Sequence, residues 1–108
     1  MVSFILVFMT TSTRAEAENI TEHLLSERLV ACCNIVGPIS SAYAWKGKIE
    51  KADEFLVFMK TSQDLFERLS ARIKELHSYD IPEVIAVPII AGLPSYLDWI
   101  STVIRPEE

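Results

Sequence analysis

The sequence has few of the residues from which common catalytic and phosphate-binding sites are built. Its 108 residues include three glycines, at positions 37, 47 and 92, which are too far apart to form a glycine-rich phosphate loop. It contains no P-loop, no G-x-G-x-x-G, no nucleophile elbow and no H-E-x-x-H. With no C-x-x-C or H-x-x-x-H spacing, a closed zinc site within one chain is not expected. These absences favour a protein without enzymatic activity.

Long hydrophobic runs are also lacking. The longest apolar run, Phe4 to Met9, is far shorter than the roughly 20 residues that a membrane-spanning helix needs, so no membrane association is expected. An N-terminal signal is not expected either, because no Lys or Arg precedes Arg14. We expect this segment to form a buried strand.

Basic residues are outnumbered, with 10 Lys and Arg against 15 Asp and Glu and a net charge of −5. No basic stripe is present to neutralise phosphates, so no nucleic-acid partner is expected. The only two cysteines, Cys32 and Cys33, are adjacent, and neighbouring residues of a strand point to opposite faces. A disulfide between them is therefore not expected, and a reducing, cytoplasmic location is predicted.

Hydrophobic residues, by contrast, are abundant. They make up 50% of a chain whose length suits one domain, residues 1–108, and mean hydropathy is +0.26. A small domain has proportionally more surface to cover with polar groups. The excess apolar surface therefore predicts contact with a partner subunit.

Periodicity and turn residues predict the element order β-α-β-β-α-β with a short final helix. The first helix should begin at the capping box Thr13-x-x-Glu16. Gly37-Pro38 should interrupt the second strand, and Pro88 should place the fourth strand at a sheet edge. The expected strands cover residues 2–10, 32–36 with 41–49, 54–61 and 84–90; the helices run from 13 to near 30, from 62 to 77, and from 94; residues 105–108 form a polar tail.

This order is the α+β, ferredoxin-like sandwich, in which right-handed crossovers put both long helices on one sheet face. The opposite face should then show polar residues if it met water. Instead, the strands at 2–9, 55–59 and 84–89 are apolar at almost every position. Apolar residues on both faces predict that another subunit covers the face without helices.

His77 is the main candidate for a functional side chain. It ends the second long helix, where a cation would also complement the helix dipole, and this structural role is the alternative. Imidazole with a nearby carboxylate from Asp80 or Glu83 suits Cu(II) or Zn(II). Tyr43 and Trp45 are expected to pack against a neighbouring subunit, and residues 50–54 to form a solvated turn around Lys51-Ala52-Asp53.

Several blocks of the sequence resemble the CutA divalent-ion tolerance family and follow its order over almost the whole chain. The blocks are LVACCNI at 29–35, YAWKGKI at 43–49, MKT at 59–61, ELHSYDIPE at 75–83, and AG at 91–92 followed by YLDW at 96–99. The resemblance implies a ferredoxin-like homotrimer built like PII signalling proteins, with a link to divalent-cation tolerance, copper in particular, and no enzymatic activity. Met9-Thr10-Thr11 stands where some members have a cysteine, and Ser78 replaces a common proline.

Three interpretations follow from the residues and the resemblance together. The first is a homotrimer that binds Cu(II) or Zn(II) weakly through His77 and Glu83, with water or a second subunit completing the ligand shell and no metal required for folding. The second is a PII-like ligand-sensing module with clefts between subunits for a small anion or nucleotide. The third is an enzyme using His77 and a carboxylate as acid and base.

Overall fold

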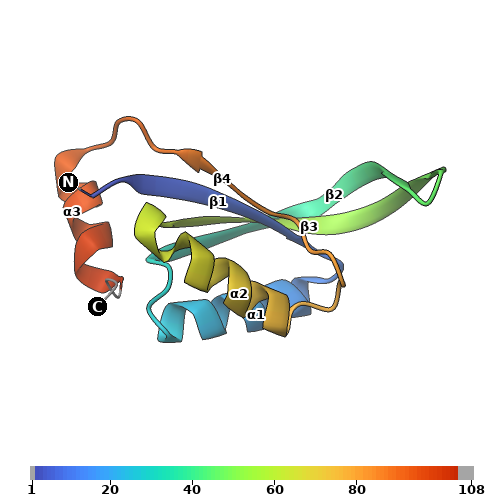
Figure 1. The fold of residues 1–108 in the computed structure, drawn as a ribbon, viewed down its shortest axis with the longest axis horizontal. Coiled ribbons are helices and arrows are strands. Elements are labelled where there is room, and N and C mark those ends of the chain that lie inside the picture. The colour runs from blue at the N-terminus through green and yellow to red at the C-terminus, as the bar shows by residue number, and fades with distance from the viewer. Residues whose placement is uncertain (1, 105–108) are drawn as a thin grey trace.

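The computed structural model describes residues 2–104 of the chain (Figure 1). The tail expected at residues 105–108 lies outside the described residues. The elements follow the predicted order, with a single 3₁₀ turn before the second long helix. They are β1 (Phe4–Thr11), α1 (Arg14–Ser26), β2 (Cys32–Trp45), β3 (Lys48–Ser62), the 3₁₀ turn (Gln63–Leu65), α2 (Phe66–Leu76), β4 (Val84–Pro88) and α3 (Pro94–Val103).

The four strands form one antiparallel sheet in the order β2-β3-β1-β4. This arrangement confirms the predicted α+β, ferredoxin-like fold. The strand that contains Pro88 lies at an edge of the sheet. Proline has no N–H, and an edge strand can accommodate it without losing a hydrogen bond between strands. The end of α1 is tied to α2 by a bidentate ion pair in which Arg72 Nε and Nη2 each lie 2.9 Å from a Glu27 carboxylate oxygen.

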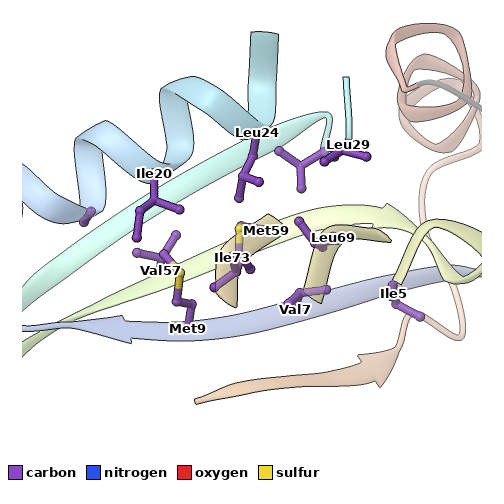
Figure 2. Packing of buried hydrophobic residues seen from close by; sticks show 12 residues of the cluster. Ile5, Val7, Met9, Ile20, Leu24, Leu29, Val57, Met59, Leu69 and Ile73 are labelled. Carbon is purple, nitrogen blue, oxygen red and sulfur yellow. The ribbon is translucent and has the colours of Figure 1, made fainter. Parts of the chain in front are cut away.

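Helices α1 and α2 lie together on one face of the sheet, as predicted from crossover handedness (Figure 1). Figure 2 shows how alternate side chains of β1 and β3 meet the apolar sides of both helices. Val7, Met9 and Met59 of the sheet and Ile20 and Ile73 of the helices are completely buried. Thr13 begins α1 as predicted, because its side chain accepts the Glu16 N–H at 3.1 Å.

The other sheet face, which we call the open face, is apolar and carries no long helix. Strand pairing places Leu6, Phe8, Leu56, Phe58, Ile85 and Val87 on it. Phe8 and Phe58 pack edge to face with ring centroids 5.6 Å apart. Ile85 and Val87 are 53% and 42% exposed in the single chain. The two-sided apolar character predicted for these strands is thus present in the structure.

The second and third strands form a longer hairpin than the sequence indicated. The turn lies at Lys46-Gly47, whose φ angles are 50° and 77°, and not at Lys51-Ala52-Asp53, which belongs to β3. Gly37-Pro38 does not end β2 but shifts its register between Val36 and Ile39. The part of the hairpin beyond this bulge, residues 39–54, is here called the arm, and it extends from the body of the molecule (Figure 1). With the arm, the molecule is 44 Å long.

The C-terminal helix α3 lies beyond one end of the sheet, near the start of β1 (Figure 1). Its Ile100 is completely buried in a small second cluster with Ala31 and Leu65. This position leaves Ile85 and Val87 of the open face uncovered. None of the helices within residues 2–104 is long and apolar enough to cross a membrane.

Candidate functional site

A pocket of about 630 Å³ lies between the arm and the loop that joins α2 to β4. Three aromatic residues line it, Tyr43 and Trp45 from the arm and Tyr79 from the loop. Three carboxylates line it as well: Glu54, Asp80 and Glu83. No Lys, Arg or His is among its lining residues. Its electrostatic character therefore favours a positively charged occupant over an anion.

Glu54 is the least exposed of the three carboxylates. The residue is only 7% exposed, although the sequence predicted it to be part of a solvated turn. Tyr79 Oη donates a hydrogen bond to Glu54 Oε2 at 2.8 Å. No residue within 2–104 donates to the other oxygen, Oε1. Burial, together with this hydrogen bond to a carboxylate, raises the pKa of Tyr79 far above 10, so the phenol keeps its proton.

His77 lies directly after α2, as predicted, but its side chain is buried beneath the loop and does not line the pocket. Its Nε2 is 2.7 Å from the carbonyl oxygen of Thr10, and its Nδ1 accepts the N–H of Tyr79 at 3.0 Å. These partners identify the neutral tautomer with the proton on Nε2. Both ring nitrogens are thus engaged by backbone groups in the single chain.

Glu16 connects the start of α1 to the same loop. Its Oε2 accepts the N–H of Ser78 at 2.7 Å and lies 3.6 Å from His77 Nδ1. Burial raises the pKa of Glu16, but the hydrogen bonds that Ser78 donates to its carboxylate outweigh this effect and lower the pKa below its ordinary value of 4.5. Proline has no N–H, so a proline at position 78 could not make this contact.

The predicted metal ligands therefore occupy different environments, His77 buried and Glu83 exposed at the pocket wall. Across residues 2–104 no group of three His, Cys, Asp or Glu side chains is arranged to hold a metal ion. For His77 to bind a metal through Nδ1, it would have to release the N–H of Tyr79. A closed site of the structural zinc type does not fit these residues, whereas a weak site completed by water or a second subunit stays a prediction.

The model of the CutA1 divalent ion tolerance protein family matches residues 5–103. The chain belongs to this family. The Thermus thermophilus relative, "Divalent-cation tolerance protein CutA", is 40% identical over 94 residues, covering 87% of this chain and 91% of its own. The Arabidopsis thaliana relative, "Protein CutA, chloroplastic", is 40% identical over 101 residues. That match covers 94% of this chain but 56% of the plant protein, so this chain spans about half of its length.

Solved structures of CutA1 proteins have the same fold. The crystal structure of CutA1 from Oryza sativa is similar with a TM-score of 0.96 at 38% identity, covering 98% of this chain and 97% of that one. The Archaeoglobus fulgidus structure, described as a periplasmic divalent cation tolerance protein CutA, gives a TM-score of 0.90 at 41% identity and covers 97% and 100%. The names of the Thermus thermophilus and Archaeoglobus fulgidus proteins refer to divalent-cation tolerance and state no catalysed reaction.

The CutA1 resemblance in the sequence singled out His77 and Glu83 but not Glu54 and Glu16, whose carboxylates contact the α2–β4 loop. Glu54 follows the charged residues Glu50, Lys51 and Asp53, which together predicted a solvated turn, and its contact with Tyr79 lies 25 residues away in the sequence. Glu16 was read only as part of a capping box, yet its carboxylate binds Ser78, 62 residues away. The available signal was the loop motif HSYDIPE itself, whose polar residues need partners wherever the loop packs.

Proposed function

We propose that this CutA1 chain acts without catalysis, as a single-domain cytoplasmic homotrimer in divalent-cation tolerance, and that it binds Cu(II) or Zn(II) weakly through His77 and Glu83. The main support for assembly is the open face, since apolar side chains such as Ile85 and Val87 are half exposed in the single chain. Family membership over residues 5–103 supports the role in cation tolerance. The free state of Cys32 and Cys33 agrees with a reducing compartment.

The carboxylates near the mouth of the pocket support a cation as ligand. Asp80 and Glu83 are exposed and follow His77 within six residues. Oxygen ligands of this kind, completed by an imidazole nitrogen, suit Cu(II) and Zn(II), and copper should bind more tightly than zinc. Binding should weaken in acid, because a protonated imidazole cannot act as a ligand.

The PII-like alternative, a sensor of a small anion or nucleotide, receives less support from this pocket. Its lining residues carry three carboxylates and no basic side chain, so an anion would be repelled. A nucleotide that raises the melting temperature would nonetheless favour the alternative.

Calorimetric titration of copper into the untagged wild type and into His77→Ala tests the metal proposal. We expect weak binding to the wild type and at least tenfold weaker binding to the variant, with both proteins kept at the same oligomeric state. Equal binding would refute the ligand role of His77.

Light scattering behind a sizing column should give three times the chain mass of 12.2 kDa. A monomer at micromolar concentration would refute the trimer, and unfolding by EDTA would refute metal-independent folding.

A further inference from the structure

We propose that the pocket between the arm and the α2–β4 loop binds an aliphatic diamine. In this arrangement Glu54 holds one ammonium group inside the pocket. Asp80 and Glu83 attract the second ammonium group at the mouth. The inference concerns an organic cation and does not depend on metal binding by His77.

The first argument is the unbalanced charge of Glu54. Glu54 as a whole residue is 7% exposed, and a carboxylate with so little access to water is stabilised by a cation or by several donors. Its only partner within residues 2–104 is the hydroxyl group of Tyr79, which is neutral. Since Oε1 receives no hydrogen bond from these residues and Glu54 lines the pocket, this oxygen is available to a donor placed there.

Nearby basic side chains do not fill this role. Lys46 points to the ring of Trp45, with Nζ 5.9 Å from the ring centroid. Lys74 donates to the backbone carbonyl oxygen of Asp80. Neither lysine lines the pocket. The described part of the chain therefore supplies the anionic half of an ion pair at Glu54 without the cationic half.

The aromatic lining favours an organic cation over a metal ion. Tyr43 and Trp45 both line the pocket and are each 46% exposed in the single chain. Aromatic faces attract alkylammonium groups and pack against the adjoining methylene groups. A divalent ion would instead need several ligand atoms at once, and no three metal-ligating side chains are grouped within residues 2–104.

The distribution of carboxylates favours two ammonium groups over one. Glu54 is buried, whereas Asp80 and Glu83 are exposed on the loop. A linear diamine presents one charge to each environment, with an apolar chain between them for the aromatic rings. The pocket, at about 630 Å³, is within the usual range for small-molecule sites.

Calorimetry with 1,4-diaminobutane on the full-length, assembled protein at fixed ionic strength tests the proposal. The uncharged 1,4-butanediol serves as a control of the same length. We expect the diamine to bind the wild type, the diol not to bind, and Glu54→Gln to bind the diamine about tenfold or more weakly, because charge-assisted hydrogen bonds are roughly twice as strong as neutral ones. Glu50→Gln is the matched control, since Glu50 lies on the same strand but outside the pocket and should bind like the wild type.

A wild type that does not bind the diamine, or Glu54→Gln with unchanged affinity, would overturn the proposal. If Glu50→Gln lost as much affinity for the diamine as Glu54→Gln, binding would reflect general attraction by negative charge, and the proposed site would be wrong. If Glu54→Gln does not fold, Trp45→Leu, a substitution at an exposed position, provides the test. It should weaken diamine binding severalfold, and unchanged binding would refute the proposal. A crystal structure of the assembled protein with a lysine or arginine of a second copy against Glu54 would assign the pocket to assembly instead.

Discussion

The imidazole of His77 is held by two backbone groups, one from β1 and one from its own loop. It joins the end of β1, through the carbonyl oxygen of Thr10, to the N–H of Tyr79 in its own loop. The neighbouring Glu16 fixes the same loop from the start of α1. This set of contacts determines where Tyr79 lies, and so where its hydroxyl group meets Glu54.

Tyr79→Phe removes the one hydroxyl group that donates to the buried Glu54 carboxylate. A buried acceptor left without a donor costs about 1–3 kcal/mol, so the free energy of unfolding in urea should fall by that amount. Tyr43→Phe is the control, because its side chain is exposed and its change should stay within about 0.5 kcal/mol. Equal effects of the two substitutions would contradict the structural importance of the Tyr79–Glu54 contact.

Glu16→Gln should reduce stability in a pH-dependent way. Because the pKa of Glu16 is lowered in the folded protein, its carboxylate stabilises the fold above the ordinary value of 4.5, and this contribution is lost as the pH falls through the folded pKa. The difference in unfolding free energy between wild type and variant should therefore be present at pH 7 and disappear in acid. Glu18→Gln, exposed on the same helix, should show a small difference that pH does not change.

At the scale of elements, the bulge in β2 allows a close approach to the strand that carries Glu54. A β-carbon added at Gly37 would lie 2.6 Å from Cδ2 of Phe55 and 3.1 Å from the carbonyl oxygen of Glu54. One at Gly47, at the tip of the arm, would meet nothing within 4 Å. Glycine at the bulge is required by space, whereas at the tip it is required by its φ of +77°.

Gly37→Ala should accordingly destabilise the protein by several kcal/mol, since ring and backbone must both move. Gly47→Ala should cost only about 1–2 kcal/mol, the strain of a left-handed residue. Chemical denaturation of both variants measures the difference. If the Gly37→Ala protein were as stable as Gly47→Ala, the bulge could accommodate a β-carbon with little cost in free energy.

The arm also shows which part of the fold the sequence could not predict. Periodicity predicted β1, α1 and α2 within a few residues because each buries one side against the core. The apolar run at residues 84–90 predicted β4, although only its first residue, Val84, is half-buried in the single chain. Residues 48–53 project from the body and bury neither face, so their sequence does not alternate between apolar and polar residues. Their charges predicted a turn at Lys51-Ala52-Asp53, which lies after the observed turn. The Lys46-Gly47 pair was the better turn signal, because a two-residue hairpin turn needs positive φ at both positions.

At the scale of the whole molecule, the open face should determine assembly. Ile85→Asp would put a charge on this face, where partner subunits would have to bury it unpaired at a cost of several kcal/mol. We expect the mass measured by light scattering to fall toward that of one chain, with helical circular dichroism retained. Leu25→Asp, at an exposed apolar position of α1, should leave the mass unchanged. Assembly that survives Ile85→Asp would show that another surface joins the subunits.

The adjacent thiols on β2 supply a chemical means to separate dissociation from unfolding. Cys32 pairs with Lys60 and shares its face of the sheet with Phe58 and the rest of the open face, whereas Cys33 packs against the core, where burial raises its pKa to about 12. Alkylation by a maleimide needs an accessible thiolate. Subunit separation should therefore expose Cys32 to labelling, while Cys33 should react only after the core opens. One peptide, with two labelling rates, then records both events in the same experiment.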